Sequence, residues 1–161
     1  MGTKFRLRQT ATNYWDKLNS AEPSTKDMVK LNFYWLCAQL GMAYDRRPGL
    51  DSGVEMVDKF TKNLEPHSPL IKGFLLAAIW RYREVKKNDI QQQFVKLLSA
   101  ETLTKISSDG MDILDNFAEG GFQMIEKNIP SKNGWSYFMQ KYHSLMRKAP
   151  SFNYNILDKK S

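Results

Sequence analysis

Cysteine, histidine and long apolar runs are all scarce in this 161-residue sequence. The single cysteine, Cys37, cannot form a disulfide within the chain, which favours a reducing compartment. No apolar run reaches the roughly 18–20 residues that cross a bilayer, and the basic start of the chain is not followed by the apolar core of a secretory signal. These absences predict a cytoplasmic protein with no membrane partner.

Motifs that carry catalysis or hold cofactors are also lacking. The sequence contains no phosphate-binding loop, dinucleotide fingerprint or serine-nucleophile elbow. His67 and His143 have no second histidine, cysteine or acid at metal-ligand spacing. Cys37 lies in an apolar segment and is expected to be a small core residue rather than a nucleophile. We therefore expect no catalytic residue, no metal and no cofactor; an enzyme that uses unmarked acids is the catalytic alternative.

Four acids recur at helical spacing in the C-terminal half: Asp109, Asp112, Asp115 and Glu119. They could be imagined as metal ligands or as a catalytic pair. A helical metal site, however, also needs acids or histidines from another helix, and no motif supplies them. We expect these acids to form the solvated face and the N-terminal cap of one helix.

Apolar spacing predicts a mainly helical single domain, of the all-α class. The composition is that of an ordinary globular protein, with 42% apolar and 25% charged residues. Spacing and capping residues predict helices over 10–19, 24–44, 68–87, 89–99, 109–128 and 134–148. A further short helix is expected over 54–64, with a strand as the alternative. The first helix is expected to be capped by Thr10 or Thr12.

The helix expected over 109–128 contains a pair of glycines, Gly120 and Gly121. Such a pair either bends a helix or admits a close neighbour. The apolar positions of this helix are expected to face inward: Met111, Leu114, Phe117, Ala118, Phe122 and Ile125. The last helix is expected to bury Trp135, Phe138, Met139, Tyr142, Leu145 and Met146.

Turn residues and charge divide the chain into three parts. Arg46-Arg47-Pro48-Gly49 lies within the best candidate linker, residues 45–53. We expect a strand-helix-helix part over 1–47, a helical bundle over 48–149 and a flexible tail over 150–161.

Positive charge is concentrated at the N-terminus of a chain whose formal net charge is +7. Residues 1–50 carry eight basic and four acidic side chains, a net of +4. Within this part, Lys4, Arg6 and Arg8 alternate with Phe5 and Leu7, which is the spacing of a strand with one cationic side. A basic surface of this kind favours association with polyanions.

A strand followed by two helices is the order found in ribbon-helix-helix DNA-binding proteins. In that arrangement two copies pair their strands into a ribbon that enters the major groove, so a homo-oligomer is expected. Lysine and arginine on the ribbon read bases or hold phosphates, and the backbone N–H groups near Ser24 and Thr25 offer a second phosphate site. The alternative is an edge strand kept soluble by its charges.

The first third of the chain also resembles the DNA sulfur-modification protein DndE family of bacterial phosphorothioation systems. The resemblance lies in Phe5-Arg6-Leu7-Arg8, Thr10-Ala11 and Leu36-Cys37, with Asp51 to Met56 as a weaker echo. It implies a small helical DNA-binding component of a bacterial modification or anti-phage system, without catalysis of its own. Its implied DNA contacts are Lys4, Arg6 and Arg8, followed by Lys17 and the pair Arg46-Arg47.

The sequence thus favours a non-enzymatic accessory protein that binds double-stranded DNA, alone or with larger protein subunits of a complex. The alternative is a helical adaptor whose aromatic-rich second and last helices bind a protein partner. Trp15, Trp35, Trp80 and Trp135 suit such a surface and suit a core equally. Replacing Lys4, Arg6 and Arg8 with alanine should weaken DNA binding. It should cost little stability, because exposed charges contribute about 0.5 kcal/mol or less each.

Overall fold

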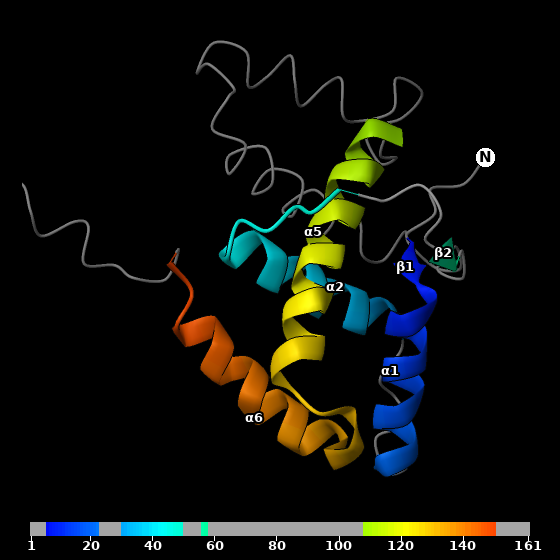
Figure 1. The fold of residues 1–161 in the computed structure, drawn as a ribbon, viewed down its shortest axis with the longest axis vertical. Coiled ribbons are helices and arrows are strands. Elements are labelled where there is room, and N and C mark those ends of the chain that lie inside the picture. Colours follow the sequence, from blue (N-terminus) through cyan, green and yellow to red (C-terminus); the bar gives the residue numbers. More distant parts are fainter. Residues whose placement is uncertain (1–5, 23–29, 50–55, 58–107, 151–161) are drawn as a thin grey trace, which may run out of the picture.

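The computed structural model describes residues 6–22, 30–49, 56–57 and 108–150, and this part is mainly α-helical (Figure 1). Its elements in chain order are β1 (Leu7–Arg8), α1 (Gln9–Ala21), α2 (Lys30–Ala43), β2 (Met56–Val57), α5 (Ser108–Asn128), the 3₁₀ helix η4 (Ser131–Asn133) and α6 (Gly134–Arg147). The expected all-α class is confirmed. The helices expected over 68–87 and 89–99, together with His67, Trp80 and the tail from residue 151, lie outside the described residues.

Helices α2 and α5 pack with their backbones in contact, and glycines make this possible. A Cβ atom on Gly121 would lie 1.7 Å from the carbonyl oxygen of Cys37, and one on Gly41 would lie 1.9 Å from that of Phe117. No other residue type leaves this space. Because α5 continues through Gly120 and Gly121, the close-neighbour interpretation of the glycine pair is confirmed.

An aromatic cluster fills the space between α1, α2, α5 and α6. The rings of Tyr14, Phe33, Phe122, Trp135 and Phe138 contact one another, mostly edge to face. Such contacts add to the stabilisation that burial itself provides. Described residues from both predicted parts of the chain, 1–47 and 48–149, therefore share one hydrophobic core.

The apolar residues expected to face inward from the long C-terminal helix are all buried in α5: Met111, Leu114, Phe117, Ala118, Phe122 and Ile125. Of the six residues predicted to be buried in α6, Trp135, Phe138 and Tyr142 are buried, and Met139, Leu145 and Met146 are partly buried. The apolar periodicity of both helices was therefore a correct guide to the core.

The N-terminal strand pairs within the chain. Leu7 lies opposite Val57 and Arg8 opposite Met56 in an antiparallel two-residue ladder, so the strand alternative for the segment 54–64 is found at these two positions. A pairing of β1 with a second copy was expected; the described partner is β2.

The threonine caps expected for the first helix are not found. Helix α1 begins at Gln9, directly after β1, and Arg8 occupies the cap position without a side-chain hydrogen bond. Thr12 lies inside the helix and is buried. The helix begins earlier than expected because it continues directly from the strand.

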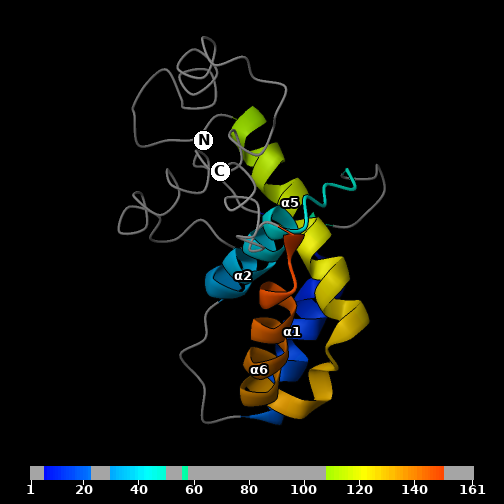
Figure 2. The same ribbon diagram turned by 90° about the vertical axis from the view of Figure 1, so that its left-hand side faces the viewer.

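The ends of α1 and α6 meet where α6 begins (Figure 1). The Glu22 carboxylate accepts hydrogen bonds from the Ser136 backbone N–H at 2.8 Å and from the Ser136 hydroxyl at 2.6 Å. An acid after one helix thus caps the N-terminus of another, where negative charge is favourable. Figure 2 shows the other end of α6 reaching α2, where Tyr142 donates a hydrogen bond to the Leu36 carbonyl oxygen at 2.8 Å.

Candidate functional site

Arg6, expected to face DNA, binds the acids of α5. Its Nε lies 2.8 Å from Asp115 Oδ2, and its backbone N–H donates to Asp115 Oδ1 at 3.2 Å. Its guanidinium also pairs with the exposed Asp112. Tyr34 completes the arrangement, because its hydroxyl donates to Asp115 Oδ1 at 2.8 Å.

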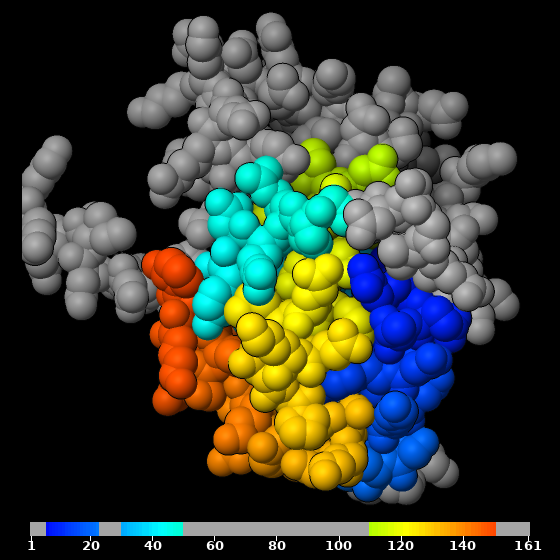
Figure 3. Space-filling model, viewed as in Figure 1, coloured from blue at the N-terminus to red at the C-terminus, as the bar shows by residue number. Residues whose placement is uncertain are grey.

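Arg8 forms a second pair one helical turn further along α5. Its Nε lies 2.8 Å from Glu119 Oε2, and its guanidinium also contacts the other carboxylate oxygen. Gln123, in the next turn of α5, donates to Glu119 Oε1 at 3.0 Å. Figure 3 shows the surface on which β1 and α1, in blue, lie beside α5, in yellow.

These pairs correct the expectation that the acids form a solvated face. The side chains of Asp115 and Glu119 are 0% and 2% exposed, and only Asp112 among the three described acids faces solvent. Buried carboxylates are stable only with charged or hydrogen-bonding partners, and the N-terminal arginines are those partners. The prediction that replacing Arg6 and Arg8 would cost little stability assumed that their side chains are exposed and unpaired. That assumption is wrong.

Burial changes the titration of this cluster. It raises the pKa of the Asp115 carboxyl to about 6, against the opposing effects of the hydrogen bonds from Arg6 and Tyr34. Burial and the neighbouring Asp115 charge likewise raise the pKa of Tyr34 well above its ordinary value. The Cys37 thiol is also fully buried, which raises its pKa and agrees with the expected core role.

The other expected DNA contacts are scattered or lie outside the described residues. Lys17 is exposed on α1, and Arg46 is exposed after the end of α2. Arg47 lies over the Phe117 ring, with its Nε 3.6 Å from Asp45 Oδ1. Lys4, Ser24 and Thr25 fall outside the described part, so those predictions stay predictions.

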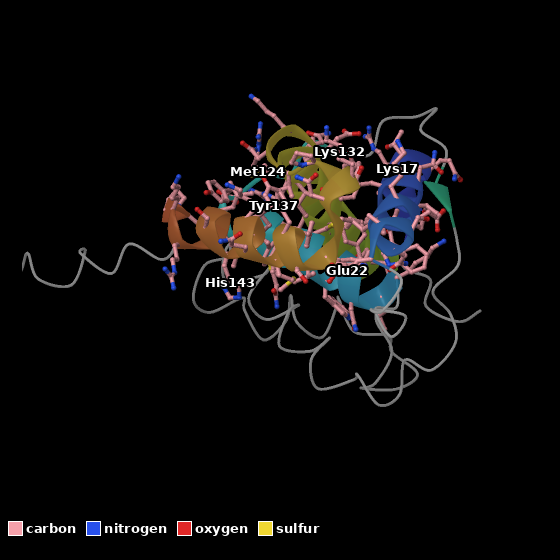
Figure 4. The ribbon with its side chains drawn as sticks, turned by 90° about the horizontal axis from the view of Figure 1, so that it is seen from below. Lys17, Glu22, Met124, Lys132, Tyr137 and His143 are labelled. Carbon is pink, nitrogen blue, oxygen red and sulfur yellow. The ribbon has the colours of Figure 1, made fainter. Side chains whose placement is uncertain are left out.

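A different group of exposed cations lies at the end of α5, on η4 and along α6. Residues 127–150, here called the acid-free segment, contain no aspartate or glutamate and five cations: Lys127, Lys132, Lys141, Arg147 and Lys148. All five are exposed. Figure 4 shows Lys132 on the same side of the molecule as Lys17, whereas His143 projects from another side of α6.

Sequence reasoning missed this segment because it averaged charge over a longer window. Residues 101–161 carry eight basic and seven acidic side chains, a net of only +1. Three of those acids, Asp112, Asp115 and Glu119, pair with Arg6 and Arg8. These three acids thus compensate N-terminal charge, and no ion pair of the α6 cations is found among the described residues. A count over shorter windows would have revealed the acid-free run.

A pocket of about 500 Å³ opens between α2 and α6. It is lined by Gln39, Tyr142, His143, Met146 and Arg147. The Tyr142 hydroxyl lies 3.4 Å from Gln39 Oε1, and the ring of Tyr142 stacks on Phe138. Two of the lining side chains, His143 and Arg147, are ionisable and belong to the acid-free segment.

Two of the tryptophans proposed for protein binding belong to the core. Trp35 and Trp135 are only 5% and 2% exposed, so they offer no contact surface to a partner. Trp15 is partly buried, and Lys30 Nζ lies 4.9 Å from the centroid of its ring.

Neither a metal cluster nor a membrane span is found in the described part of the chain. No three histidine, cysteine or acidic side chains there are grouped so that they could hold a metal ion. None of the helices in these ranges has the length and apolar character needed to cross a bilayer. No protein-family model matches the chain, and neither a similar curated protein nor a similar solved structure was found.

Proposed function

We propose that this protein is a non-enzymatic DNA-binding accessory protein, as the sequence suggested, but that it contacts DNA through α6 rather than through the N-terminal strand. The observation that carries the proposal is the acid-free segment, with five exposed cations and no acid among residues 127–150. Exposed cations that form no ion pair among the described residues attract the phosphate backbone and release its counterions.

Three of the five cations lie in the C-terminal half of α6 or directly after it. Lys141 and Lys148 are seven residues apart and share a face of the helix, and Arg147 lies beside them near its end. Arg147 in the last turn also interacts favourably with the helix dipole. Because residues 127–150 contain no aspartate or glutamate, none of these three cations has an acidic neighbour in the sequence.

The N-terminal strand is a weaker candidate, because its arginines are already paired. Contact of Arg6 or Arg8 with phosphate would require breaking ion pairs with nearly buried carboxylates. Leaving such a carboxylate without its partner is costly. Lys17 and Arg46 have no such partner in the described part of the chain and form a reasonable comparison surface.

The experiment compares two triple variants that remove the same amount of charge. In one, Lys141, Arg147 and Lys148 are changed to glutamine; in the other, Lys17, Arg46 and Arg47 are changed in the same way. Affinity for DNA is measured by fluorescence anisotropy over a range of salt concentrations. We expect the first variant to lower the slope of log affinity against log salt by up to about 2.7, or roughly 0.9 for each phosphate that the protein no longer neutralises.

The second variant should keep most of the salt dependence of the wild-type protein. Wild-type binding that is undetectable at about 50 mM salt, or unchanged up to about 200 mM, would contradict DNA binding itself. If the slope of log affinity against log salt decreases more in the second variant than in the first, the DNA-binding surface lies on the N-terminal part instead.

A further inference from the structure

We infer that the outward side of α6 enters the major groove of double-stranded DNA, where Gln140 and Ser144 contact the edges of bases. The inference rests on the proposed function, because it names the form of DNA, the groove and the residues that make binding depend on base sequence.

The outward side of α6 is fixed by the side that is buried. Buried residues such as Phe138 and Tyr142 face the core, so the middle of the opposite side falls at Gln140 and Ser144, which are one turn apart. Both side chains are exposed, and these two residues are here called the outward ridge. In the described part of the chain α6 packs against α1, α2 and η4, and it lies along one margin of the helices in Figure 1.

Cations lie on both flanks of the outward ridge. Helical spacing places Lys141 and Lys148 on one flank and Arg147 on the other. Figure 4 shows Tyr137 and His143 projecting from different sides of α6, and the Tyr137 ring lies on the lysine flank, with its centroid 5.4 Å from Lys141 Nζ. A helix inside the major groove faces base edges in front and a phosphate backbone along each side. The positions of the cations match this arrangement.

The outward ridge has hydrogen-bonding groups to offer to bases. Neither Gln140 nor Ser144 has a hydrogen-bond partner within the ranges that the structure describes. A glutamine amide can pair with both the N6 donor and the N7 acceptor of adenine, and a serine hydroxyl can donate to or accept from a base edge. Both residues can therefore add sequence preference to the attraction between the cations and the phosphates.

The composition of this side of α6 favours nucleic acid over a protein partner or a membrane. Its exposed residues are all polar or cationic: Ser136, Gln140, Lys141, His143, Ser144 and Arg147. The centre of a protein interface is enriched in aromatic residues and depleted of lysine, and a helix lying on a membrane exposes an apolar face. The apolar face of α6 is instead buried in the core.

Duplex DNA suits the outward ridge better than duplex RNA does. The major groove of B-form DNA is about 12 Å wide and admits an α-helix, whereas that of A-form RNA is too deep and narrow for side chains to read. The C-terminal half of α6 should lie closest to the DNA, because the Glu22 carboxylate, which accepts hydrogen bonds from Ser136, lies at the other end of the helix. Negative charge there repels phosphates.

The test begins with selection of DNA sequences by the full-length wild-type protein from a pool of random duplexes. We expect enrichment of a short sequence, bound about fivefold or more tightly than a duplex with one base pair changed, which is the least that one good bidentate contact provides. Replacing the purines of the enriched sequence with 7-deazapurines removes an acceptor in the major groove but keeps base pairing and phosphate charge. This replacement should weaken binding by a similar factor.

Substitutions on α6 separate base contacts from phosphate contacts. Gln140→Ala and Ser144→Ala should each lose the preference at one position of the enriched sequence and keep the salt dependence. Lys141→Gln should weaken binding to every duplex by the same factor and lower the slope of log affinity against log salt by about 0.9. Asn32→Ala, at an exposed position of α2, is the control and should keep the preference. Alanine is the most favourable residue in a helix, so the alanine variants should fold.

Three outcomes would overturn the inference and leave DNA binding intact. They are the absence of an enriched sequence, undiminished affinity for the 7-deazapurine duplex or for an RNA duplex of the same sequence, and an unchanged preference in the double variant Gln140→Ala/Ser144→Ala. Failure of the wild-type protein to bind any duplex would instead refute the proposed function as well.

Discussion

Arg6 and Asp115, 109 residues apart in the sequence, are joined by two hydrogen bonds from the same arginine, one from its backbone and one from its guanidinium. The carboxylate of Asp115 is completely buried, and the arginine side chain is 32% exposed. The N-terminal strand is thereby fixed to the middle of α5. Arg8 and Glu119 repeat the arrangement one turn further along the helix.

Replacing both arginines with alanine should destabilise the protein. Each change leaves a nearly buried carboxylate without its charged partner, and removing one partner of a buried pair costs about 3 kcal/mol or more. Lys17→Ala, at an exposed position, is the control and should change stability by no more than about 0.5 kcal/mol. Chemical denaturation measures both. A double variant as stable as the control would show that the ion pairs contribute nothing.

The pKa of Asp115 predicts a particular dependence of stability on pH. Burial raises this pKa from 3.8 to about 6, so the folded protein holds the proton more tightly than the unfolded chain does. The contribution of Asp115 to the free energy of unfolding is therefore largest below its unfolded pKa. It falls by about 1.4 kcal/mol for each pH unit as the pH rises toward 6.

Asp115→Asn, which cannot ionise, isolates this contribution. The free energy of unfolding of the wild-type protein minus that of Asp115→Asn should fall as the pH rises from about 4 to about 6, and should change little above about 7. Urea denaturation at several pH values provides the measurement. A difference that increases with pH would mean that Arg6 lowers the pKa of Asp115 more than burial raises it.

Glu22 should stabilise the start of α6 only when it is ionised. Its hydrogen bonds with Ser136 lower the pKa of the Glu22 carboxyl from 4.5, so its contribution is present above that value and disappears as the pH falls below it. We expect Glu22→Gln to melt at a lower temperature than the wild-type protein at neutral pH. The two proteins should converge in acid.

Asp16→Asn, at an exposed position of α1, is the control for Glu22→Gln and should leave the melting temperature unchanged. Thermal unfolding followed by circular dichroism distinguishes these outcomes. Equal melting temperatures for Glu22→Gln and the wild-type protein at neutral pH would show that the cap has no effect on stability.

The close approach of α2 and α5 should make Gly121→Ala strongly destabilising. The new methyl group would lie 1.7 Å from the Cys37 carbonyl oxygen, and the backbone of α2 cannot move aside without disturbing the core. We expect the free energy of unfolding to fall by at least about 3 kcal/mol, at or beyond the usual range for overpacking, or the protein to fail to fold.

Gly49→Ala is the matched control. Gly49 has a φ of +82° but no atom within 4 Å of the added methyl group, so only conformational strain of about 1 kcal/mol is expected. Equal effects of the two substitutions on the free energy of unfolding would contradict the close packing of the helices as the cause.

The sequence predicted well wherever a residue's position depends on its near neighbours. The apolar spacing of α5 and α6 identified buried positions such as Phe117, Phe122 and Phe138, because one side of a helix must leave water. The apolar surroundings of Cys37 likewise predicted its burial. The Gly120-Gly121 pair indicated a close neighbour but could not identify it as α2.

The charged residues were harder to place, because charge acts between residues that only the fold brings together. The alternation from Lys4 to Arg8 predicted a strand with a cationic side, and β1 is a strand at Leu7 and Arg8. Nothing local indicated that its arginines would meet Asp115 and Glu119, more than a hundred positions away.

The sequence by itself determined a helical chain, the apolar faces of α5 and α6 and an excess of positive charge. Only the tertiary structure decided which of those charges are compensated. Arg6 and Arg8 lie against buried acids that need them, whereas the cations of α6 are exposed and form no ion pair among the described residues. The physical reason is that periodicity is a property of neighbouring residues, whereas the energy of a charge depends on the burial and the partners that folding creates.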